Sequence, residues 1–104
     1  MIFRRDRFAA VIERQLDLFE RDHRDVVEEA LAKLDLYNAA DRDAAEELYG
    51  DYVDAVETGT ELLADLRDHY AASLEAEPAD RYLAEFNKRV TRRLPTFALE
   101  IENR

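Results

Sequence analysis

The fold of this chain is decided by a stretch in its first third, residues 5–37, which reads RDRFAAVIERQLDLFERDHRDVVEEALAKLDLY. Apolar side chains recur in this stretch every three or four residues, at Phe8, Ile12, Leu16, Phe19, Val26, Val27, Ala30, Leu34 and Tyr37. That spacing places them on one face of an α-helix and leaves the charged residues on the other face. The stretch therefore predicts one long amphipathic helix over residues 5–37.

Two further helices are predicted by the same spacing. After the first helix, Asn38 tolerates the backbone conformation that ends a helix, and Asp41 can cap the next one. We expect this second helix over residues 43–74. A third helix is expected over residues 78–94, with Pro78 in its first turn, where a missing amide hydrogen costs nothing.

The remaining tail, residues 95–104, begins with a proline and then alternates apolar and polar residues. This pattern fits either an extended segment or a kinked helical continuation. No internal repeat or glycine-serine linker interrupts the chain, and 104 residues suit one core. We therefore interpret residues 1–104 as a single helical-bundle domain.

Short connections make successive helices antiparallel neighbours, so the sequence predicts an all-α, up-down-up three-helix bundle. The first two helices would each span about 48 Å and the third about 25 Å, at roughly 1.5 Å per residue. Half of the long hairpin thus needs other cover, either a second copy of the chain or the tail. Because the tail has few apolar side chains, we expect a coiled-coil-like homodimer. Its interface should lie near Tyr37, Leu48, Tyr49, Tyr52 and Val53.

The composition excludes several classes of function. With 25 acidic and 15 basic residues the formal net charge is −10, whereas a nucleic-acid binder needs a positive surface. Cysteine is absent, which excludes disulfides, thiol catalysis and cysteine-bound zinc. No apolar stretch is long enough for a signal peptide or a membrane span. We therefore expect a cytoplasmic protein that binds neither nucleic acid nor membrane.

The charge is distributed unevenly along the chain. Residues 41–80 hold thirteen acidic and two basic residues, whereas residues 81–104 hold six basic and three acidic ones. Opposite charges on neighbouring helices commonly complement one another at the surface. We therefore expect the basic third helix, including Arg89, Arg92 and Arg93, to pack beside the acidic second helix. Contact of these arginines with phosphate or with a partner's acids is the alternative.

One motif raises the question of metal binding. Glu20 and His23 have the i, i+3 spacing that helical di-iron bundles use to share a metal between two side chains. The other histidine, His69, falls about nine residues out of step with His23 in a tight hairpin, which is about 14 Å along the helix axis. We therefore expect no bound metal, and Glu20 and His23 stay weak candidates.

Polar residues interrupt the apolar faces at two levels. In a tight hairpin His23 lies level with Thr60, and Arg93 of the third helix reaches the same level, while Gln15 lies level with Arg67. Buried polar groups are costly unless they are paired, and such pairs fix the register of a bundle. We interpret these residues as structural polar layers, with a ligand pocket formed by His23, Thr60 and Arg93 as the alternative.

Signs of catalysis are few. The only serine, Ser73, lies in a predicted helix, and the chain has neither a nucleophile turn nor a phosphate-binding loop. We therefore expect no enzymatic activity and no cofactor. The sequence favours a small acidic, non-enzymatic helical module that forms a homodimer and binds a protein partner. A metal-handling bundle using Glu20 and His23, or a small-ligand-binding bundle, stays open.

Overall fold

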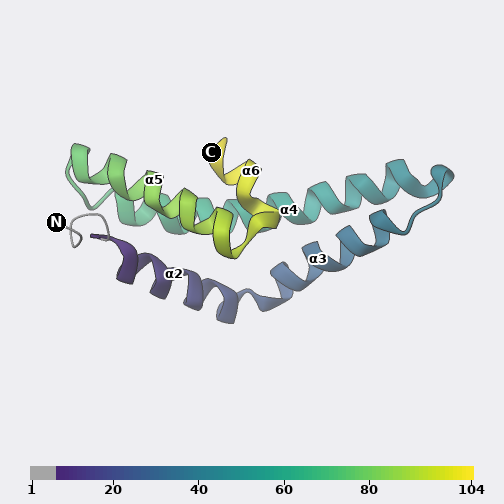
Figure 1. Ribbon diagram of the computed structural model, residues 1–104, viewed down its shortest axis with the longest axis horizontal. Helices are drawn as coiled ribbons and strands as arrows, with labels where there is room; N and C mark the ends of the chain where they lie inside the picture. The colour runs from purple at the N-terminus through teal and green to yellow at the C-terminus, as the bar shows by residue number, and fades with distance from the viewer. Residues whose placement is uncertain (1–6) are drawn as a thin grey trace.

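The computed structural model describes residues 7–104, and every regular element in that range is helical, as the periodicity predicts (Figure 1). No strand occurs between residues 7 and 104. The elements are, in chain order, α2 (Ala9–Asp22), α3 (Arg24–Asn38), α4 (Arg42–Ala71), α5 (Ala76–Arg93), the 3-10 helix η1 (Pro95–Phe97) and α6 (Ala98–Glu102).

The predicted single helix over residues 5–37 is wrong at one point, because two helices meet at His23. The backbone of His23 has φ −124° and ψ 35°, outside helical geometry. The amides of Val26 and Val27 both donate to its carbonyl, at 3.0 and 3.2 Å, which starts α3 as a new helix. One distorted residue scarcely alters a 3.6-residue period, so the apolar spacing does not reveal the break. The first two residues of the predicted helix lie outside the described residues.

The ends of α4 and α5 follow the local signals in the sequence. The Asp41 carboxylate accepts a hydrogen bond from the amide of Ala44 at 3.0 Å and caps α4, as predicted. The helix ends at Ala71, three residues before the predicted end. The next helix, α5, starts two residues earlier than predicted and keeps Pro78 in its first turn.

The core lies at one end of the molecule, where α2, α5, α6 and the C-terminal half of α4 pack together. We call this part the body. Its largest fully buried side chains come from all of these elements and from η1; they are Ile12, Leu16, Leu63, Tyr82, Phe86, Val90, Phe97 and Ile101. Aromatic rings meet edge to face inside it, as Phe8 and Tyr82 do at 5.5 Å between centroids. The apolar faces that the sequence predicts therefore converge on one core.

The tail, which the sequence left open between an extended segment and a kinked helix, is helical and folds back onto α4. The residue before a proline is kept out of helical geometry, and Leu94 accordingly ends α5 with φ −134° and ψ 62°. The chain then turns, so that Phe97 and Ile101 become buried. Gly59 makes room for this turn, because a Cβ at that position would lie 2.7 Å from Cζ of Phe97.

The other end of the molecule is a two-helix arm, which consists of α3 and residues 42–58 of α4 (Figure 1). The arm makes the molecule elongated, with extents of 53 × 23 × 22 Å and a radius of gyration of 15.6 Å. A compact chain of this length has a radius of gyration of about 13 Å. In Figure 1, α5 ends near the middle of the long axis, and α3 and α4 continue without it to the far turn.

Close packing between Gly59 and Phe97 predicts the effect of an added methyl group. We expect Gly59→Ala to lower the free energy of unfolding by about 1–3 kcal/mol, because the added methyl group would overlap the ring of Phe97, which is fully buried. Gly50, in the same helix, has no atom within 4 Å of the position that a Cβ would occupy. Gly50→Ala should therefore raise the stability by about 0.5–1 kcal/mol through helix propensity alone. Urea unfolding of both variants checks this, and equal stabilities would contradict it.

Candidate protein-interaction surface

Apolar side chains remain exposed on the arm because α5 stops before it. Leu31 of α3 is 46% exposed and Tyr49 of α4 is 51% exposed. The end of α5 meets α3 at a shallow groove, where Leu94 lies beside Val27 and Leu31. Beyond this point no third helix of the described chain covers the arm (Figure 1). The arm's own chain therefore leaves several large apolar side chains partly open. We call them the apolar strip; its members are Leu31, Tyr37, Leu48, Tyr49, Tyr52 and Val53.

All five residues predicted near an interface lie on this arm. Tyr37, Leu48, Tyr52 and Val53 are half-buried, and Tyr49 is exposed. Three of the rings form a row, with centroids 5.2 Å apart between Tyr37 and Tyr49 and 6.4 Å apart between Tyr49 and Tyr52. Half-buried aromatic rings of this kind are enriched where proteins meet, because they bury much area and lose little entropy. Leu31 and Leu36 are exposed on the arm as well, although neither was among the predicted interface residues.

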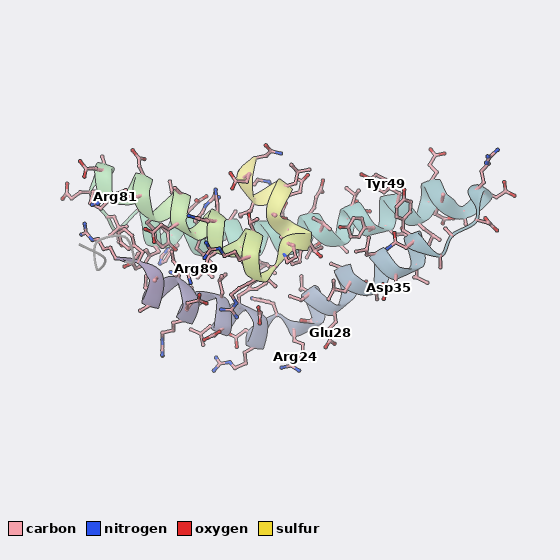
Figure 2. All side chains as sticks on the ribbon, in the orientation of Figure 1. Arg24, Glu28, Asp35, Tyr49, Arg81 and Arg89 are labelled. Atoms are coloured by element: carbon pink, nitrogen blue, oxygen red, sulfur yellow. The ribbon has the colours of Figure 1, made fainter. Side chains whose placement is uncertain are left out.

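The arm is strongly acidic. Residues 24–58 hold eleven carboxylates and three basic residues, a net charge of −8. Within residues 7–104, none of these eleven carboxylates forms an ion pair. Figure 2 shows Arg24 and Glu28 on the side of α3 that faces away from α4. The apolar strip is thus framed by charges that have no counterpart in the described chain.

The basic third helix packs against α4, as predicted, but Arg89 and Arg93 pair with acids of α2 and not with those of α4. Arg93 lies 2.7 Å from a carboxylate oxygen of Glu13, 2.9 Å from one of Asp17 and 3.2 Å from one of Glu20. Arg89 also contacts Glu13, and Figure 2 shows it between α5 and α2. The charge totals could not reveal this, because α2 has a net charge of only −2, and three of its four acids pair with α5.

These contacts change the acidity of Glu13. The hydrogen bond from Arg93, together with the charge of both arginines, holds the pKa of Glu13 below its ordinary value of 4.5 and outweighs the opposing effect of desolvation. The pKa of Arg93 is raised, since the carboxylates of Glu13 and Asp17 outweigh the burial that would lower it. Glu13 and Arg93 are therefore both charged at neutral pH, and their ion pair joins α2 to α5.

The predicted polar layer of Gln15 and Arg67 is buried, but the two residues bind α5 and α6 instead of each other. The Tyr82 hydroxyl donates to Oε1 of Gln15 at 2.8 Å. Arg67 donates to Oδ1 of Asn87 at 2.9 Å and to the carbonyl of Ile101 at 3.1 Å. Burial raises the pKa of Tyr82 to about 12, so its hydroxyl stays protonated and remains a donor. These bonds fix the register of α5 and α6 on the hairpin.

The second predicted layer does not form. Thr60 is buried, but its hydroxyl donates to the carbonyl of Val56 in its own helix at 2.8 Å. The ring of His23 is half-buried and lies against Phe19, with 5.4 Å between the centroids. Arg93 turns to the acids of α2. Within residues 7–104 no hydrogen bond joins His23, Thr60 and Arg93 to one another, so they do not form a paired polar layer.

The residues of the weak metal motif have other surroundings in the structure. Glu20 is engaged by Arg93, and His23 sits at the junction between α2 and α3. Within residues 7–104 no three His, Cys, Asp or Glu side chains are grouped closely enough to hold a metal ion. Nothing in the described geometry therefore favours the metal-handling alternative.

Residues 7–104 also contain no helix with the length and apolar character needed to span a membrane.

Comparisons of the chain with protein-family models, with curated proteins and with solved structures find no significant match.

The hydrogen bond between Tyr82 and Gln15 predicts that removing its donor alone lowers the stability more than removing both partners. Tyr82→Phe should lower the free energy of unfolding by about 1–3 kcal/mol, because the buried Gln15 oxygen loses its donor. Adding Gln15→Leu to that variant should recover part of the loss, since no polar group is then left unpaired. Urea unfolding of the two single variants and the double variant measures the coupling. Additive losses would contradict the bond.

The ion pairs of Glu13 predict a pH dependence of stability. Because the pKa of Glu13 is lowered in the folded chain, its contribution is fully present above pH 4.5 and is lost as the pH falls through the lowered value. Glu13→Gln should cost about 0.5–1 kcal/mol at neutral pH, since solvent reaches this carboxylate and weakens the pairs. The cost should vanish by about pH 2.

Glu61→Gln is the matched control for this measurement, because Glu61 is an exposed acid that forms no ion pair within residues 7–104. Thermal unfolding should show no change for the control at either pH. A Glu13→Gln cost that is the same at acidic and neutral pH would refute the role of the ion pairs.

Proposed function

We propose that this chain is a non-enzymatic protein-interaction module that forms a homodimer through the apolar strip of its arm. In this proposal the outer, acidic faces of the arms stay in solvent and bind a protein partner. The observation that carries the proposal is the strip itself, since Leu31 and Tyr49 are about half exposed on a two-helix arm that α5 meets only at its base. Large apolar side chains grouped on a surface typically mark an interaction site.

A non-enzymatic role is supported by the way the interior polar groups are used. Gln15, Thr60 and Arg67 each make a hydrogen bond inside the fold. Within residues 7–104, no buried side-chain nitrogen or oxygen lacks a hydrogen-bond partner. A polar site prepared for a substrate would typically hold groups that the fold itself does not satisfy. The polar interior therefore serves register and stability.

The proposal also accounts for the architecture that the sequence predicts. In the body α5 lies against both α2 and α4, which supports an up-down-up three-helix arrangement there. Along the arm the bundle lacks its third member. Two arms packed face to face would form a four-helix assembly and would bury both strips, as a symmetric dimer requires.

The proposal predicts that a charge in the strip weakens the dimer. We expect Tyr49→Glu to raise the dimer dissociation constant by more than about tenfold, because each copy would bury an unpaired carboxylate at the interface. Tyr49 is half exposed in the single chain, so the variant should fold normally. Sedimentation equilibrium over a range of concentrations measures the constant, and circular dichroism confirms the helical content.

Leu99→Glu is the matched control, because Leu99 is 75% exposed but lies on α6, away from the arm. It introduces the same charge at an exposed apolar residue and should leave the dissociation constant unchanged. A wild-type chain that stays monomeric at several hundred micromolar would overturn the homodimer, and equal effects of the two variants would overturn the location of its interface.

A further inference from the structure

The open strip of the arm begins where α5 ends. Leu94 and Arg93 lie beside Val27 and Leu31 at this point, so the last turn of α5 stands at the entrance of the groove. Pro95 then turns the chain toward α6 and leaves the line of α5 vacant along the rest of the arm. A helix pair from another molecule can therefore enter the groove end-on to α5.

We propose that the partner in this groove is the arm of a second copy, packed antiparallel, so that the tip of each arm contacts the basic end of the other copy's α5. We define the arm tip as residues 35–47 and the basic end as residues 88–93. The inference rests on the proposed function, because it specifies the geometry of the homodimer. It commits to one orientation of the two arms and to a charged contact that a parallel dimer cannot make.

Steric constraints favour the antiparallel orientation. In each copy α5 covers one side of the hairpin up to Leu94, and the apolar strip continues along the arm on that same side. A parallel dimer would place the two α5 helices opposite each other between the copies and would hold the arms apart. In an antiparallel dimer each arm instead lies beyond the end of the other α5. The arms are equal in length, about 22 Å for the fifteen residues of α3, so each strip is covered along its whole length.

The charges favour the same orientation. The arm tip holds five acidic residues and one basic residue, whereas the basic end of α5 holds four basic residues and no acid. Arg89 and Arg93 are already bound to α2, but Arg92 and Lys88 are exposed and form no ion pair within residues 7–104. An antiparallel dimer brings a tip of net charge −4 to Lys88 and Arg92, the two basic-end residues that α2 does not already pair, at both ends. A parallel dimer would instead bring the two acidic tips together.

The chain has no cysteine, so single introduced cysteines report the orientation without background. We would prepare Asn38→Cys in the arm tip, Arg92→Cys in the basic end, and Ser73→Cys at the far end of the body as the control. Mixed under mild oxidation, Asn38→Cys and Arg92→Cys should form a disulfide-linked heterodimer. Asn38→Cys alone should remain uncrosslinked, and so should its mixture with Ser73→Cys.

A charge exchange tests the contact itself. At low ionic strength, Arg92→Glu should raise the dimer dissociation constant by about tenfold, because the two-fold symmetry alters two contacts at once. Adding Asp43→Arg should restore most of the affinity, and 0.5 M salt should reduce both effects by screening the charges. Lys33→Glu, a change of the same charge on the arm but outside the tip, serves as the control and should not be rescued by Asp43→Arg.

The outcomes separate this inference from the proposed function. Disulfide formation by Asn38→Cys with itself would show a parallel dimer, which would overturn the inference and leave the homodimer intact. The inference would also be overturned, with the homodimer kept, by a second result. In that result Tyr49→Glu weakens the dimer, but neither the mixed crosslink nor the charge rescue is seen. A chain that stays monomeric yet binds a synthetic lysine-leucine amphipathic helix would overturn the second copy as occupant while keeping the arm as an interaction surface.

Discussion

The third helix is shorter than the hairpin that it covers, and the rest of the structure depends on this mismatch. Pro95 follows Leu94 and prevents α5 from continuing, because the residue before a proline is kept out of helical geometry. The chain then has to turn, and the turn places Phe97 against Gly59. One end of the molecule thereby gains a closed core, and the other end remains a two-helix arm with an open apolar strip.

The two ends are held by different forces. The body combines aromatic and aliphatic packing with buried hydrogen bonds from Tyr82 and Arg67, and an arginine network ties α5 to α2. The arm is held mainly by the contact of α3 with α4, and its carboxylates are not paired within the described residues. A two-helix unit with one open apolar face is an incomplete bundle. The stability of the arm and its binding of a partner are therefore expected to be coupled, because anything that binds only the folded arm stabilises it.

The distribution of charge follows the same division. The basic residues of the last third serve two purposes in our interpretation. Arg89 and Arg93 neutralise the acids of α2 inside the chain, whereas Arg92 and Lys88 face outward at the point where the arm begins. The pairing inside the chain fixes α5, and in the dimer that we propose the outward charges favour one orientation of the second copy. Such complementarity selects among arrangements more strongly than it adds affinity.

The sequence by itself determined the helical fold, the Asp41 cap, the short third helix and the identity of the arm residues, because these depend on local spacing and on lengths along the chain. Only the tertiary structure decided the break at His23, since a single distorted residue leaves the apolar period almost unchanged. It also decided the partners of Gln15, Arg67 and Arg93, which depend on how α5 is rotated and shifted against the hairpin. A periodic pattern gives the face of a helix, but it does not give the rotation of one helix against another to within the few ångströms of a hydrogen bond.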